Sequence, residues 1–370
     1  MATMTPADAT LQVRTFRRSP LSRARGHVGA LWRRPLTQAI AKAVLTIYVT
    51  STITFFLIRL MPGSPVELKI DELMQTGQMS YADAAAAASG LFDIDLNAPV
   101  GQQYLEYLAN LARADLGNSF LSQGTSVTSI VLAVLPWTLF AVGTGLLLSF
   151  VCGIGLGLVA AYRRNSPLDH VVSTAGSVIS SVPAYLIALL ILLIFGIQLR
   201  WLPITQMRGA FSPGMTPGFS LAFIGDLFFH AALPISVFFL THIGLWILSM
   251  RSATLAALEE DHVTVARARG LSDGRITTAY VGRNAVLPLV SQFAIAAGAV
   301  VGGAVIIEQI FVYQGVGLRL VKAVDQRDYP VMQGIILMTT VAVIVANLVA
   351  DLLYSRLDPR IGRAGGASGT

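Results

Sequence analysis

Charged and polar side chains that could do chemistry lie close together in residues 258–272, which run Leu-Glu-Glu-Asp-His-Val-Thr-Val-Ala-Arg-Ala-Arg-Gly-Leu-Ser. The three acids favour a helix N-terminus, because the helix dipole is positive there. Good helix formers follow, and Gly270 stands where a C′ glycine ends a helix. Ala266 and Ala268 keep such a helix slender. The stretch therefore predicts a short, separate helix that can dock in a groove on a soluble partner, with an ordinary surface loop as the alternative.

Enzyme chemistry has little support elsewhere in the chain. No lysine follows a glycine, so the phosphate-binding pattern GxxxxGK[ST] is missing and the chain is not expected to hydrolyse ATP itself. No His/Cys group has metal-ligand spacing, and no Ser/His/Asp set is indicated. We therefore predict no catalytic residue, no metal and no cofactor. Cys152 is the single cysteine, which excludes an intrachain disulfide.

His242 is the clear ionisable residue within an apolar stretch, while Glu308 and Asp351 lie near the ends of such stretches. An ionisable side chain inside a membrane is by default a candidate for function, for example as a proton relay. His242 has no carboxylate partner in its own stretch, which favours a neutral histidine hydrogen-bonded between helices. This shortage of ionisable groups argues against ion-coupled transport.

The composition is that of a membrane protein. Hydrophobic residues make up 54% of the 370-residue chain and charged residues 12%, whereas soluble domains usually have about 25% charged residues. The net charge of +6 could indicate nucleic-acid binding. The basic residues lie between apolar runs rather than on one polar face, so no nucleic-acid partner is predicted.

Six apolar stretches are long enough to span a bilayer, which takes about 20 residues. Backbone polar groups must be paired within each stretch, so all six are predicted to be helices and the fold to be all-α. We expect Pro183 to kink the third. The predicted spans are Ala39–Leu60, Val131–Ala161, Val171–Ile197, Ala231–Met250, Ala285–Ile307 and Val331–Tyr354.

The basic residues orient these spans. Eighteen of the 26 Lys and Arg residues lie on the side of the two chain ends, and this side is predicted to be cytoplasmic. Both termini are therefore expected in the cytoplasm, and the basic tail is expected to be disordered and to contact anionic lipid. The predicted organisation is a tail at 1–38, the first span at 39–60, an extracytoplasmic segment at 61–130, a core at 131–357 with a cytoplasmic loop at about 251–284, and a tail at 358–370.

Two local patterns refine this organisation. Tyr104, Leu105, Leu108 and Leu111 recur at helical spacing and predict a short amphipathic helix outside the membrane. Small residues on three spans predict close helix packing, with a pathway lined by small and polar groups as the alternative. They are Gly143, Gly145, Gly153, Gly155 and Gly157, then Ser173, Gly176, Ser177 and Ser180, then Ala294, Ala297, Gly298, Gly302 and Gly303.

Residues 266–272 together with Arg-Asn-Ala-Val-Leu-Pro at 283–288 resemble the coupling loop of ABC importer permeases, and are most similar to the dipeptide/oligopeptide/nickel branch. The resemblance extends through most of the chain beyond the tail, at residues 57–65, 103–104, 115–119, 201–203, 327–330 and 347–360. Four positions depart from the family pattern, and one of them is Tyr280, which replaces a histidine. At the other three, Thr264 replaces a glutamate, His262 a tyrosine and Gln314 a proline.

The resemblance implies a type I ABC importer permease in a bacterial inner membrane. Its implied partners are a second, similar permease, two ATP-binding subunits and an extracytoplasmic substrate-binding protein. Segment 61–130 is expected to meet that binding protein or to gate the outer mouth. The resemblance also implies which residues contact the ATPase: Asp261, His262, Ala266, Arg267, Ala268, Gly270 and Leu271.

Other roles stay open at this level. Arg267 and Arg269 pair with acids on the partner or are simply solvated. Ser291, Gln292 and Gly298 are pathway candidates, with packing as the alternative for Gly298. An ion-coupled secondary transporter is the competing function, but it would need paired acids within spans and internal repeats. A membrane scaffold without transport activity is a third alternative, and the coupling-loop motif argues against it. The branch carries di- and oligopeptides, nickel, glutathione-like compounds and some oligosaccharides, so the solute is not determined.

Overall fold

The structure is a computed structural model that describes residues 35–61, 65–77, 79–89, 98–122 and 124–357. Within these ranges the regular elements are helices, accompanied by one isolated bridge between Asn118 and Ser126. The all-α prediction is therefore confirmed. The predicted tails lie outside the described residues, apart from residues 35–38, which open the first helix.

Two compact units divide the chain, one ending at Tyr48 and the other beginning at Val49. In the first unit the structure describes only the beginning of α2, and every site discussed below lies in the second. The helices are α2 (Pro35–Arg59), α3 (Pro65–Gly77), α4 (Tyr81–Ser89), α5 (Val100–Ala112), α6 (Val127–Tyr162), α7 (Pro167–Ser180), α8 (Ala184–Ile191), the π-helix η1 (Leu192–Gln198), α9 (Leu221–Leu258), α10 (Asp261–Ala268), α11 (Asp273–Arg275), the π-helix η2 (Ile276–Gly282), α12 (Arg283–Phe311), α13 (Val316–Asp325) and α14 (Tyr329–Leu357).

Membrane-span candidates among the described residues number four, or up to six if two bent helix pairs each count as one span. The four are in α2, α6, α9 and α14, and α12 contains the fifth predicted span. α9 is longer than predicted at both ends, which shortens the preceding loop to residues 199–220. α5 confirms the predicted amphipathic helix, whereas α3 and α13 were not predicted.

The third predicted span is bent more sharply than the expected kink. α7 and α8–η1 meet at 101° across residues 181–183. Proline lacks an N–H and disfavours the helical conformation of the residue before it, so the helix stops ahead of Pro183. The Ser181 hydroxyl donates a 2.8 Å hydrogen bond to the Ser177 carbonyl, which satisfies one carbonyl at the broken end. A new helix then starts at Ala184.

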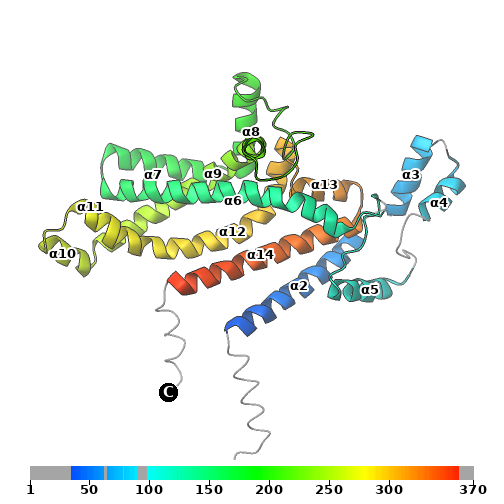
Figure 1. Cartoon of the computed structure of the whole chain (residues 1–370), viewed down its shortest axis with the longest axis horizontal. Coiled ribbons are helices and arrows are strands. Elements are labelled where there is room, and N and C mark those ends of the chain that lie inside the picture. The colour runs from blue at the N-terminus through cyan, green and yellow to red at the C-terminus, as the bar shows by residue number, and fades with distance from the viewer. Residues whose placement is uncertain (1–34, 62–64, 78, 90–97, 123, 358–370) are drawn as a thin grey trace, which may run out of the picture. The chain divides into compact units, whose positions relative to one another are not determined.

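Small residues bring α6, α7 and α9 close together, side by side in Figure 1. A Cβ atom on Gly145 would lie 2.6 Å from the Cβ of Phe238, and one on Gly153 would lie 2.5 Å from the Cβ of Trp246. A Cβ on Gly244 of α9 would collide with the carbonyl of Gly176 in α7. The predicted packing role is confirmed for Gly145, Gly153 and Gly176, because only glycine allows the two backbones this approach, and Gly244 is a further such position.

Replacing Gly153 by alanine is expected to lower the thermal unfolding midpoint of the purified protein, because α6 and α9 would have to move apart. Such overpacking costs about 1–3 kcal/mol. Gly155→Ala is the matched control, because no heavy atom lies within 4 Å of the added Cβ and alanine favours a helix. Equal midpoints for the two variants would contradict the close approach of α6 and α9.

Candidate functional site

The helix predicted between the fourth and fifth spans is α10, a separate helix of eight residues. Gly270 has a φ of +73°, the left-handed conformation that favours glycine. The Gly270 N–H donates to the Arg267 carbonyl, and the Leu271 N–H donates to the Ala266 carbonyl. These two bonds form a Schellman motif, which ends the helix where the sequence predicted.

One face of α10 packs on its own chain. Val263 and Ala266 are buried in an apolar cluster with Ala257 of α9 and with Ile276 and Val281 of η2. Leu271 and Leu258 are partly buried against the same cluster. α10 is therefore held to the end of α9 and to the π-helix that leads into α12.

The opposite face of α10 is exposed. Asp261, Thr264, Val265 and Ala268 occupy helical positions i, i+3, i+4 and i+7, and all four are exposed. The side chain of Val265 is 53% exposed although it is apolar. The structure thus brings two of the predicted contact residues, Asp261 and Ala268, onto one surface. Thr264 and Val265 were missed, although helical spacing from Asp261 would have found them.

The other predicted contact residues are arranged differently. Arg267, Arg269 and Gly270 are exposed beside this face. His262 is partly exposed, and its Nδ1 lies 3.0 Å from a carboxylate oxygen of Glu260. Ala266 is only 3% exposed and faces its own chain, because Val263 and Ala266 form the buried stripe of an amphipathic helix. Its side chain is therefore placed in the helix support rather than on the free surface.

A cleft of about 490 Å³ lies between α9 and α12, and it contains Gln292, one of the predicted pathway residues. The polar groups that line it are the hydroxyls of Ser249 and Ser252 and the amide of Gln292. The remaining lining residues are Leu248, Ala253, Ala256, Pro288 and Leu289. Ser291 and Gly298 lie on the same helix α12, but their side-chain surroundings are outside the described part of the structure.

Among the described residues, the hydrogen bond that the structure gives His242 is to its own helix. Its Nδ1 lies 2.9 Å from the carbonyl oxygen of Phe238, one turn earlier in α9 itself. A side chain on a helix can reach the carbonyl one turn earlier, and this local bond satisfies one ring nitrogen. The prediction of a hydrogen-bonded His242 is right, but the partner is in its own helix.

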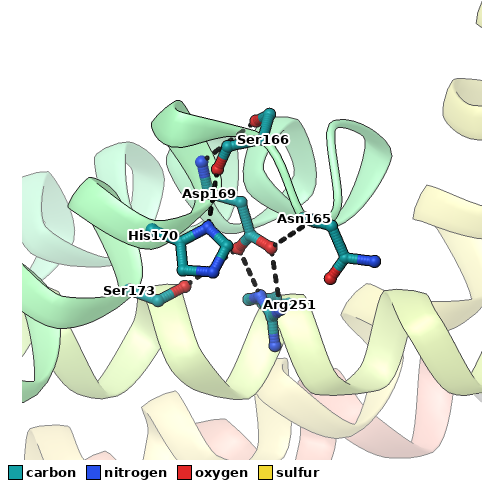
Figure 2. A network of polar contacts seen from close by, with 6 residues as sticks. All are labelled: Asn165, Ser166, Asp169, His170, Ser173 and Arg251. Atoms are coloured by element: carbon teal, nitrogen blue, oxygen red, sulfur yellow. Dashed lines mark hydrogen bonds and ion pairs between the residues drawn. The ribbon is translucent and has the colours of Figure 1, made fainter.

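An ion pair with a buried carboxylate joins α7 to α9 (Figure 2). Its arginine, Arg251, lies near the end of α9 that leads into α10. Asp169 is 2% exposed, and its two carboxylate oxygens accept from Nε and Nη2 of Arg251 at 2.6 and 2.9 Å. The Asn165 backbone N–H and the Ser173 hydroxyl also donate to this carboxylate. Asp169 therefore ties the α6–α7 turn, α7 and α9 together.

A second buried carboxylate, Glu308, lies at the 83° bend between α12 and α13. It accepts hydrogen bonds from the Thr138 hydroxyl at 2.6 Å and from the backbone N–H groups of Gly317 and Leu318 at 2.7 and 3.1 Å. The Val316 N–H donates to the Thr138 hydroxyl at 2.8 Å. The first N–H groups of α13 thus find partners on α12 and α6, in place of the cap that a helix N-terminus needs.

Two of the sequence motifs meet through a third buried carboxylate. Asp328, from the 327–330 motif, is 1% exposed and accepts from the Ser119 hydroxyl at 2.5 Å and from the Phe120 N–H at 3.2 Å. Ser119 ends the motif at residues 115–119. Segment 61–130 is therefore fastened to the loop before α14 by residues 209 positions apart.

Comparison with known proteins identifies the family of this chain. Residues 153–363 match the family described as binding-protein-dependent transport system inner membrane component. A Brucella suis protein named as a peptide permease is 36% identical, with 83% of this chain and 92% of that protein covered. The di/tripeptide transport system permease protein of Pseudomonas aeruginosa is 33% identical, with 88% and 98% covered. The oligopeptide transport system permease protein of Bacillus subtilis is 30% identical, with 84% and 93% covered. With its helical core, its separate α10 and a family match over more than half its length, this chain belongs to the binding-protein-dependent transport system inner membrane components.

Proposed function

We propose that this chain is a permease subunit of an ATP-driven peptide importer and that α10 is the helix through which it couples to an ATP-binding subunit. As a member of its family, the chain is a multi-pass protein of a bacterial inner membrane. Its relatives are named for peptides, di/tripeptides and oligopeptides, which supports peptides as the solute class. Members of the family are components of transport systems that depend on binding proteins, which supports the presence of ATPase and substrate-binding partner subunits.

The observation that carries the proposal is the two-sided character of α10. Its buried side packs against α9 and η2, and its exposed side consists of Asp261, Thr264, Val265 and Ala268. Short side chains let the backbone of a slender helix approach a groove closely. An apolar residue that is 53% exposed on such a face is suited to burial against a partner.

The same contacts suggest how movement of α10 reaches the solute. α10 is joined to α9 by a two-residue connection and to α12 through η2. α9 and α12 are the two walls of the cleft that contains Ser249, Ser252 and Gln292. Closure of ATPase subunits on ATP would displace α10 and shift both walls, so that ATP biases two arrangements of the pathway. A second, similar permease subunit would complete that pathway, with its own α10 on a second ATPase.

The first experiment purifies the full chain from its own cell and measures peptide uptake with and without ATP depletion. Co-purification of ATP-binding subunits and loss of uptake on ATP depletion are expected. A preparation that contains no ATPase subunit, together with uptake that survives ATP depletion, would contradict the proposal. An ion-coupled transporter would give this second result.

Replacing Ala268 by glutamate is expected to release the ATPase subunits, because a long charged side chain would stand on the docking face. Loss of the complex should reduce ATP-dependent uptake at least about tenfold, which corresponds to about 1.4 kcal/mol of docking free energy. Ala112→Glu, at an exposed alanine at the end of α5, is the matched control for helix propensity and charge. The ratio of ATPase to permease in the purified complex is the measurement. An unchanged ratio in Ala268→Glu would remove α10 from the ATPase contact.

A further inference from the structure

A small pocket lies where the end of α2, the helix α5 and the start of α14 meet. Its volume is about 70 Å³, and the residues that line it include Phe55, Arg59, Gln103, Tyr107 and Gln333. One water molecule needs about 10–15 Å³ of such volume, so the pocket has room for a group of several heavy atoms, such as a carboxylate. The predicted topology places these helix ends on the extracytoplasmic side.

Arg59 is held rigidly in the pocket wall. Its Nε and Nη2 donate to the side-chain oxygen of Gln103 at 3.0 and 2.6 Å, and its guanidinium carbon lies 3.7 Å from the ring centre of Phe55. The Gln103 amide donates in turn to the Ala98 carbonyl at 2.8 Å. The edge of the guanidinium that carries Nε and Nη2 therefore already has its hydrogen-bond acceptor. These contacts fix the orientation of the guanidinium in the absence of a ligand.

Two buried donors remain for a ligand. Within the part of the chain that the structure describes, Nη1 of Arg59 and Nε2 of Gln333 are both buried and have no hydrogen-bond partner. Gln333 is 9% exposed, and both side chains line the same pocket. A buried donor without a partner costs about 1–3 kcal/mol, more when it is charged, so an acceptor that reaches both donors is strongly favoured.

The charge around the pocket selects among acceptors. Glu106 and Asp115 line it as well, and both are exposed. A doubly charged anion such as sulfate would be repelled by these two carboxylates. A single carboxylate on Arg59 is compatible with them, and an ammonium group on the same ligand would be attracted to them. Arginine and carboxylate also match in hydrogen-bond geometry.

We propose that this pocket binds the carboxylate of a small zwitterionic compound, such as the chain end of a short peptide, through Arg59 and Gln333. The carboxylate oxygens accept from Nη1 of Arg59 and Nε2 of Gln333, and the ammonium group lies toward Glu106 and Asp115. The site is separate from the cleft between α9 and α12, and its occupation does not require that the proposed ATP coupling is correct.

The test measures phenylglyoxal modification of Arg59 by peptide mass spectrometry, in the purified full chain in nanodiscs. Dialanine at ten times its dissociation constant is expected to slow modification about tenfold, whereas dialanine amide has no effect. Arg113, which is exposed at the end of α5, reports general effects and should react at an unchanged rate. Gln333→Leu is expected to raise the dialanine concentration for half-protection about tenfold, and Gln102→Leu, at an exposed glutamine of α5, is its control.

Every other outcome of this experiment contradicts the proposed binding of a carboxylate in this pocket. Equal modification of Arg59 with and without dialanine would overturn it. Equal protection by dialanine and its amide, or protection by sulfate, would overturn the carboxylate assignment. Protection of Arg59 by the substrate-binding protein alone, without any effect of dialanine, would assign the pocket to protein docking instead. Because the measurement is made without transport, failure of the importer proposal would leave this result unaffected.

Discussion

Replacing Asp169 by alanine is expected to be among the most destabilising single changes in this protein. The carboxylate is buried and accepts from Arg251, Asn165 and Ser173, so its loss leaves a partly buried guanidinium and a backbone N–H without their acceptor. Removing one partner of a buried ion pair costs about 3–5 kcal/mol. Because the Arg251 side chain is 30% exposed and water can solvate part of it, we expect the lower end, about 3 kcal/mol.

The measurement is the thermal or denaturant unfolding midpoint of the purified protein. Asp273→Ala, at an exposed aspartate that opens α11, is the control and should change stability by less than about 0.5 kcal/mol. The double variant Asp169→Leu with Arg251→Met should recover most of the loss, because it removes both charges together. A double variant no more stable than Asp169→Ala would show that packing, rather than the unpaired charge, dominates this site.

Replacing Glu308 by alanine is the second change with a large expected effect. It would strip the acceptor from the Gly317 and Leu318 N–H groups and from the Thr138 hydroxyl, all inside the protein. Each buried group left without a partner costs about 1–3 kcal/mol, so a total loss of about 3 kcal/mol or more is expected. α13 should separate from α12 and α6 first, because its N-terminus has lost its cap.

Two further variants test this explanation. Gln309→Ala, at the exposed neighbouring position, should leave the unfolding midpoint nearly unchanged. Gly315→Ala should resemble Glu308→Ala, because a Cβ at Gly315 would collide with the Glu308 carboxylate. Protection of the α13 amides from hydrogen exchange gives the local readout. Normal α13 protection in Glu308→Ala would rule out the capping role.

The predictions from sequence that hold are those that depend on short-range physics. Apolar length predicted α2, α6, α9 and α14, because the energetic requirement to pair backbone groups in lipid applies to each stretch separately. Acids before alanines and Gly270 after them predicted α10, because helix ends depend on neighbouring residues. Pro183 predicted a kink for the same reason, although the observed bend of 101° is sharper than a kink.

Other features were invisible because they join residues far apart in the chain. In the sequence Arg251 is only one more basic residue, and nothing near it points to Asp169, 82 positions away. Glu308 lies near the end of a predicted span, but its hydrogen-bond partner Thr138 is 170 positions away in the sequence. The motifs at 115–119 and 327–330 were separate resemblances until Asp328 joined them.

The sequence by itself determined that this chain is a helical membrane protein with a short separate helix at α10, because apolar length and capping residues are properties of one continuous stretch of chain. Only the tertiary structure decided which face of α10 is free, which glycines touch α9, and that Arg59 and Gln333 share a pocket. These depend on the approach of separate helices to within a few ångströms. Packing of the whole core determines that approach, and local residue preferences do not specify it.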